Sequence, residues 1–104
     1  MSAEYNLSKP EFNNDEDILN RLQAARQLIN KFETLWALYV NNQVPDSLDA
    51  EEGMRIFAEE LRQSYEALNT ELRPIIDDLN FDVSLPLLII QNAADDCANR
   101  VRML

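Results

Sequence analysis

The sequence contains no histidine, one glycine, one cysteine and four prolines among its 104 residues. Without histidine the chain lacks the usual activator of a serine nucleophile and the commonest metal ligand. The single Cys97 cannot form a disulfide within the chain, which agrees with a reducing compartment. So little glycine and proline leaves few turns for β-hairpins, and we therefore expect an all-α fold.

Basic residues and long apolar runs are also scarce. The 9 Lys and Arg stand against 19 Asp and Glu, so the formal net charge is −10 at pH 7. This charge excludes docking on nucleic-acid phosphates or on anionic membranes, which both attract basic proteins. No apolar run approaches the about 18 residues of a membrane span, and residues 1–5 lack the organisation of a secretory signal. We expect a cytoplasmic protein that prefers a basic protein partner.

Apolar residues recur at helical spacing in three stretches, and the first of these organises the chain. Its seam alternates steps of four and three residues: Ile18, Leu22, Ala25, Ile29, Phe32, Trp36 and Tyr39. A chain of 104 residues with 46% hydrophobic residues is sufficient for one core. The pattern predicts a single all-α domain, residues 1–104, folded as an antiparallel three-helix bundle.

The predicted helices cover residues 14–42, 49–79 and 85–104, and residues 1–7 are predicted to form a flexible arm. Pro74 lacks an amide donor and crowds the preceding turn, so the second helix should be kinked or broken near it. Asp46, Ser47 or Asp49 can cap that helix, and Ser84 can cap the third.

The third predicted helix carries apolar side chains on more sides than a three-helix bundle covers. A contiguous exposed apolar patch usually marks an interface, so we predict that this helix also forms an oligomer, most simply a two-fold homodimer. The alternative is that the second helix and the amino-terminal arm fold over it. The predicted interface residues are Leu85, Leu88, Ile89 and Ala93.

Carboxylates occur in adjacent pairs, such as Glu51-Glu52 and Glu59-Glu60. Neighbours on a helix point about 100° apart, so a pair does not share a site and is more simply a solvated surface. The run Asp78-x-Asn80-x-Asp82 matches the first ligands of an EF-hand loop. Val83 and Ile89 replace the required Gly and bidentate Glu, which leaves a helix-capping turn as the simpler interpretation. We predict no catalytic residue, cofactor or metal site.

These features favour an interaction module that docks on a basic partner and inhibits or masks it. Small acidic helical inhibitors act in this way, among them immunity proteins of bacteriocin nucleases and phage-encoded anti-defence proteins. The likeness is one of size and charge. The predicted partner-binding residues are Asp15, Glu16, Asp17, Glu51, Glu52, Glu59, Glu60 and Glu66.

Three other functions fit the sequence. A structural or assembly subunit, or a chaperone, would act through the third helix and use its acidic residues for solubility. A divalent-metal-dependent hydrolase would use carboxylates alone. Mimicry of DNA phosphates would need an unbroken acidic stripe, whereas Arg55 and Arg62 interrupt this one and are spaced to pair with Glu59 and Glu66.

Overall fold

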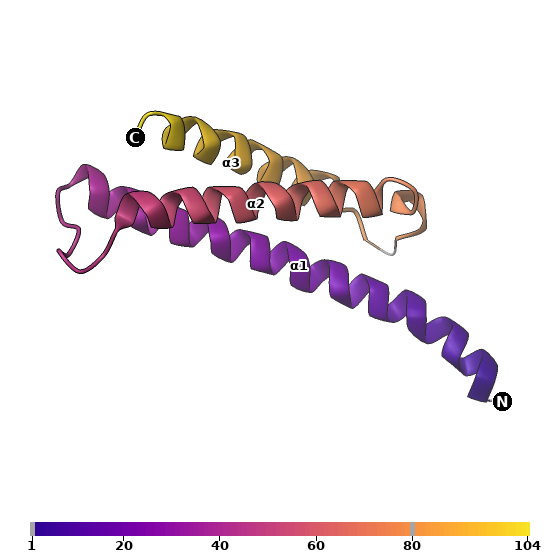
Figure 1. The fold of residues 1–104 in the computed structure, drawn as a ribbon. Helices are drawn as coiled ribbons and strands as arrows, with labels where there is room; N and C mark the ends of the chain where they lie inside the picture. The colour runs from indigo at the N-terminus through magenta and orange to yellow at the C-terminus, as the bar shows by residue number, and fades with distance from the viewer. Residues whose placement is uncertain (1, 80) are drawn as a thin grey trace.

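The computed structural model describes residues 2–79 and 81–104, and for residues 2–14 it describes the backbone alone. This part of the chain contains no strand. It forms three α-helices and one turn of 3₁₀-helix: α1 (Ser2–Val40), α2 (Ala50–Leu72), η1 (Ile76–Asp78) and α3 (Ser84–Arg102). Consecutive helices run antiparallel, in a molecule measuring 61 × 24 × 16 Å (Figure 1). The predicted antiparallel three-helix bundle is confirmed.

α1 is longer than predicted. It begins at Ser2 instead of near residue 14, so residues 2–7 are helical where we expected an arm, and Met1 lies outside the described residues. The helix continues through Pro10 although a proline removes one backbone hydrogen bond. Its first turns extend beyond the ends of α2 and α3 (Figure 1). A helical turn without a packing partner leaves no apolar seam in the sequence, which explains the wrong starting point.

α1 ends in a Schellman motif built around Asn42. The Gln43 amide donates to the Leu38 carbonyl at 2.8 Å, and the Asn42 amide donates to the Tyr39 carbonyl at 3.2 Å. Asn42 has a φ of 56°, a left-handed conformation that asparagine tolerates better than most residues. The chain then turns back into α2.

The ends of α2 follow the sequence closely. Asp49 is its N-cap and accepts the Glu52 amide at 3.1 Å. The helix stops at Leu72, and η1 follows after a short turn, so the predicted break near Pro74 is confirmed.

The predicted cap of α3 is wrong. Ser84 is the first helical residue, and the N-cap position is Val83. Asp82 supplies the side-chain acceptor, since its Oδ1 receives the Ser84 amide at 2.9 Å. This backbone hydrogen bond lowers the pKa of the Asp82 carboxyl below its ordinary value.

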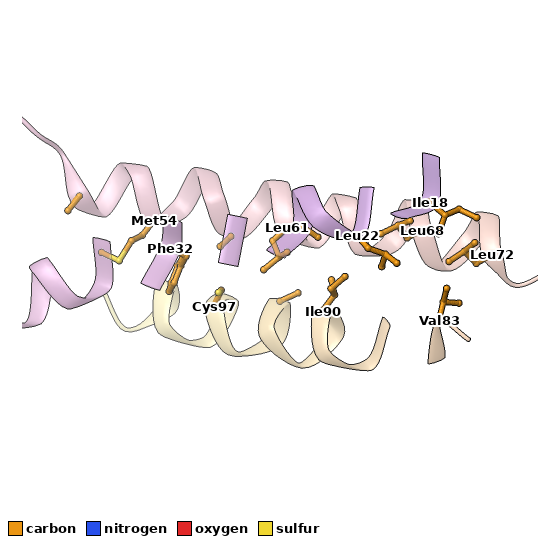
Figure 2. Close-up of a cluster of buried hydrophobic side chains, with 14 residues drawn as sticks. Ile18, Leu22, Phe32, Met54, Leu61, Leu68, Leu72, Val83, Ile90 and Cys97 are labelled. Carbon is orange, nitrogen blue, oxygen red and sulfur yellow. The ribbon is translucent and has the colours of Figure 1, made fainter. Parts of the chain in front are cut away.

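The core lies along the line where all three helices face one another (Figure 2). Burial of these apolar side chains is the main favourable term in folding. Its largest fully buried side chains are Phe32, Met54, Leu61, Leu68, Leu72, Val83, Ile90 and Cys97. Most of these positions belong to the seams that the sequence predicts.

Candidate interaction surfaces

The solvent side of α2 carries an acidic stripe. We define the α2 stripe as Glu52, Glu59 and Glu66, which follow one another at seven-residue intervals and are all exposed. Each lies two residues before a buried core residue (Met54, Leu61 or Leu68), and two residues turn about 200° around a helix. The stripe therefore faces away from the core, with its carboxylates about 10 Å apart along the axis.

Arginines of the same helix pair with this stripe. Arg62 bridges Glu59 and Glu66, with a distance of 2.7 Å from Arg62 Nη1 to Glu66 Oε2. Arg55 pairs with Glu51 at 3.6 Å and, more loosely, with Glu52 at 3.9 Å. The predicted pairing of Arg62 with Glu59 and Glu66 is confirmed, whereas Arg55 pairs with the preceding Glu51 and Glu52 instead of with Glu59. The stripe is thus an ordered array of carboxylates with a basic flank.

Hydrogen bonds hold the Glu59 carboxylate in its charged form. Arg62 is the main donor, and Gln63 Nε2 donates at 2.9 Å; together they lower the Glu59 pKa below its ordinary value. Glu60 lies next to it and is exposed, and it makes no ion pair within the described part of the chain. Glu60 is therefore available to a basic group from outside.

The predicted acidic surface is not one continuous patch. Asp15, Glu16 and Asp17 lie in the amino-terminal half of α1, just before the core residue Ile18, and α1 is antiparallel to α2. They are therefore close to the carboxyl end of α2, whereas Glu51 and Glu52 are at its amino end (Figure 1).

Arg21 connects Asp17 of α1 with Glu71 near the carboxyl end of α2. Arg21 contacts Asp17 at 3.5 Å and donates two hydrogen bonds to Glu71, at 2.8 and 2.9 Å. Glu71 is an acidic surface residue that the sequence reasoning missed, because contacts between helices leave no periodic signal.

The outer side of α3 is apolar over its first two turns. Leu85 is 63% exposed, Leu88 49% and Ile89 41%. We call these three residues the α3 patch. The second helix and the amino-terminal segment do not cover it, so that alternative is wrong for the described residues. Ala93, the fourth predicted interface residue, is half-buried and packs against the core.

A groove runs beside the α3 patch, between α2 and α3. Its walls combine apolar with polar side chains: Tyr65, Leu72, Ile76, Leu87 and Leu88 stand beside Asn69, Ser84, Gln91 and the charged Arg73. The cavity volume is about 390 Å³. The groove adjoins the patch through Leu88, at the end of the bundle where α3 begins.

Arg100 of α3 covers the aromatic side chains of α1. Its guanidinium is 5.1 Å from the Trp36 ring centre and donates to Glu33 at 2.8 Å. Trp36 also stacks on Phe32, with ring centres 6.4 Å apart. These aromatic side chains therefore pack against the protein's own arginine, a contact of which the sequence gives no sign.

Cys97 is buried in the core, as its position on the third seam predicts. Burial raises the pKa of its thiol to about 11, and the nearby Asp96 adds to the effect. The thiol is therefore protonated at neutral pH and is a poor nucleophile.

A hollow with a volume of about 970 Å³ lies at the loop between α1 and α2. Tyr39, Val44 and Leu48 form part of its wall, and Asp49 and the half-buried Glu51 also line it. The Asp49 carboxylate is engaged in capping α2. The hollow is an open feature of the protein surface.

The described residues contain neither a metal-binding cluster nor a membrane-spanning helix. No three His, Cys, Asp or Glu side chains in residues 2–79 and 81–104 are arranged to hold a metal ion. Asp82 of the EF-hand-like run is occupied as a capping residue, and Asn80 lies outside the described residues. None of the described helices is long and apolar enough to cross a membrane.

No protein-family model, curated protein or solved structure matches this chain. The proposals below therefore depend on its own surfaces.

Proposed function

We propose that the protein is a small acidic interaction module that docks through α2 on a basic surface of a partner protein and inhibits or masks it. The observation that carries this proposal is the α2 stripe, three exposed carboxylates in line at two-turn spacing. The net charge of −10 supplies long-range attraction to a basic partner, which accelerates encounter.

An exposed isoleucine lies beside the stripe and supports docking at this surface. Ile56 is 48% exposed and lies four residues after Glu52 and four before Glu60, on the same side of α2. Central apolar contacts usually supply most of the affinity of an interface, whereas rim charges set the rate and the specificity. On docking, the partner would remove Ile56 from water, and the surrounding carboxylates would form the rim of the interface.

The arginines of α2 favour a protein partner over mimicry of DNA. Arg55 and Arg62 place positive charge along one edge of the stripe, where a phosphate backbone has none. A partner surface that carries both basic and acidic groups can pair with the glutamates of the stripe and also with the arginines along its edge. The same ion pairs hold the glutamates in fixed positions, which reduces the entropy lost on binding.

The test is capture from a lysate of the source organism, at about 50 mM and about 500 mM salt, where Debye screening differs strongly. The wild-type protein is compared with Glu59→Lys/Glu60→Lys. The matched control is Asp77→Lys/Asp78→Lys, which changes the net charge equally but lies on η1. We expect a partner that wild type and control retain at low salt, and that the α2 variant and high salt both release.

Equal loss of this partner in both variants would show that net charge alone is responsible and would overturn docking through α2. Retention of the partner by the α2 variant would also overturn it. Circular dichroism confirms that each variant keeps its helical content. Ile56→Ala should weaken capture without changing its dependence on salt.

A second function, as an assembly subunit acting through α3, is favoured by the exposure of Leu85, Leu88 and Ile89. The two functions differ in their response to salt. Charge-led docking weakens as salt screens the carboxylates, whereas apolar assembly does not.

A further inference from the structure

We infer that the α3 patch packs against the same patch of a second copy of this chain, about a two-fold axis near Leu88. The observation behind this inference is the unusual combination of exposure and composition at the start of α3. Leu85, Leu88 and Ile89 are between 41% and 63% exposed, and they adjoin a groove that is partly lined by apolar side chains. Exposed apolar area of this kind is stabilised when a partner removes it from water.

Charge favours a second copy as the occupant. Residues 83–94 contain no charged side chain, in a chain whose net charge is −10. Two copies repel each other wherever their carboxylates meet, and this stretch is a place where they can approach without such repulsion. A basic partner, in contrast, gains no ion pair from this surface. The patch therefore suits a neutral apolar partner, and an identical patch fulfils that condition.

The spacing of the patch suits a two-fold helix crossing. Its residues follow the i, i+3, i+4 pattern, which forms a short ridge on one side of a helix. Ridges of two helices commonly pack at about 50°, and such a crossing confines contact to a few turns. Asp82 before the patch and Asp95 after it then lie outside the contact. A two-fold axis lets each ridge meet its own copy, as isologous interfaces require.

The groove beside the patch enlarges the contact. Its apolar lining consists of Tyr65, Leu72, Ile76, Leu87 and Leu88, and Arg73 is the one charged residue among its lining residues. An apolar side chain of the second copy can enter this space of about 390 Å³. Even so, three exposed side chains and one shallow groove fall short of the about 800 Å² per partner of a standard interface. The dimer is therefore reversible and dissociates on dilution.

Dimerisation through α3 leaves the α2 stripe free. The patch is on α3 and the stripe is on α2; α2 also supplies Tyr65 and Leu72 to the groove, but no stripe residue lines it. A dimer presents two acidic stripes, so it can engage a partner with two basic sites more tightly than a monomer can. The inference does not depend on the proposed function, because self-association is measured without any partner.

The experiment is sedimentation equilibrium of the full chain from about 1 µM to about 1 mM, a range that covers weak association. Wild type is compared with Leu88→Asp and with a matched control, Leu19→Asp. Leu19 is 52% exposed on α1 and Leu88 is 49% exposed on α3, so both variants place a carboxylate at a similar solvent exposure. We expect the average mass of wild type and control to rise toward that of a dimer with concentration. Leu88→Asp should raise the dissociation constant at least tenfold.

Salt provides a second readout. Raising the salt concentration screens repulsion between two negative copies, so the wild-type dimer should persist or strengthen at about 500 mM salt. The inference is overturned if wild type remains monomeric at about 1 mM, or if both variants weaken the dimer equally. The inference is also overturned if added salt dissociates the dimer, because charge would then be what holds the two copies together. Should Leu88→Asp lose helical content, Leu85→Ser at the most exposed position of the patch replaces it.

Discussion

Gly53, the only glycine of the chain, lies at a close approach between α2 and α1. A Cβ added there would be 2.8 Å from Leu35 Cδ1, which is too short unless the leucine moves. Leu35 is half-buried and its terminal methyl group is flexible, so it can adjust at a cost. From the sequence alone this glycine is only a weak helix former near the start of a helix. Its packing role appears when the two helices are brought together.

Gly53→Ala should therefore show coupling to Leu35. Alanine favours a helix by up to about 1 kcal/mol over glycine, but in the wild type this gain is offset by displacement of Leu35. In a Leu35→Ala background the obstacle is absent, so Gly53→Ala should be more stabilising there by about 0.5–1 kcal/mol. Chemical denaturation of the four proteins of this double-mutant cycle measures the difference. Additive effects, within about 0.3 kcal/mol, would contradict the close approach.

At the scale of helices, two arginines connect α1 with its neighbours. Arg21 joins α1 to Glu71 of α2, and Arg100 joins α3 to Glu33 of α1. Both arginine side chains are less exposed than their acidic partners, at 30% and 25%. Such pairs contribute modestly to stability, and their geometry helps to fix how the helices align.

Removal of Arg21 should change the titration of Glu71. The Arg21 guanidinium, mainly through its hydrogen bonds, lowers the Glu71 pKa below the ordinary value of 4.5. Arg21→Gln should return that pKa toward 4.5. NMR titration of the Glu71 carboxyl carbon measures the change, with Glu59, whose pKa is lowered by Arg62, as the control carboxylate that should not move. A Glu71 pKa unchanged by the substitution would contradict the pair.

The lowered pKa of Glu71 also determines how the stability of the fold depends on pH. A carboxyl whose folded pKa is depressed stabilises the fold above its unfolded pKa, and the contribution is lost as pH falls through the folded pKa. The Arg21–Glu71 pair therefore acts at neutral pH and disappears in acid, once the pH falls through the lowered pKa of Glu71. Arg21→Gln should lower stability at neutral pH and leave it little changed in strong acid.

The bundle could be predicted because core positions repeat along the sequence. Ile18, Leu22 and Phe32 are buried as their spacing requires, and Pro74 breaks α2 because proline lacks an amide donor. The start of α1 could not be predicted, since those turns extend past the bundle and bury no seam. The Asp82 cap was missed because several polar residues near a helix start are suitable and backbone geometry selects one.

The candidate surfaces were predictable to a similar extent. The exposure of Leu85, Leu88 and Ile89 follows from counting apolar positions around α3, and the pairing of Arg62 follows from helical spacing. The separation of Asp15 from Glu51 required knowledge of the helix directions, which place the two groups at opposite ends. Ile56 was missed because a single exposed isoleucine is common on protein surfaces.

For the whole molecule, the excess of acidic residues has two opposing effects on stability. Ion pairs within a helix, such as Arg62–Glu66, are weakened by salt. Repulsion among the carboxylates, whose net charge is −10, is also weakened by salt, and it extends over the entire 61 Å length. Because exposed pairs contribute little, the relief of repulsion should be the larger effect.

Thermal stability should therefore rise with ionic strength. Between about 20 mM and 500 mM NaCl we expect the melting temperature of the monomeric Leu88→Asp variant to increase by about 4 °C, which corresponds to about 1 kcal/mol for a domain of this size. Differential scanning calorimetry measures it. Asp77→Lys/Asp78→Lys in the same background is less negative and should show a smaller increase. A falling melting temperature would mean that the ion pairs dominate.

Trp36, the only tryptophan of the chain, lies where Arg100 of α3 covers α1. Detachment of α3 from the other two helices would therefore uncover the side of the indole that Arg100 contacts. Water reaching the ring would shift the indole emission to longer wavelengths without any added dye. The protein thus carries an intrinsic fluorophore that reports whether its last helix is in place.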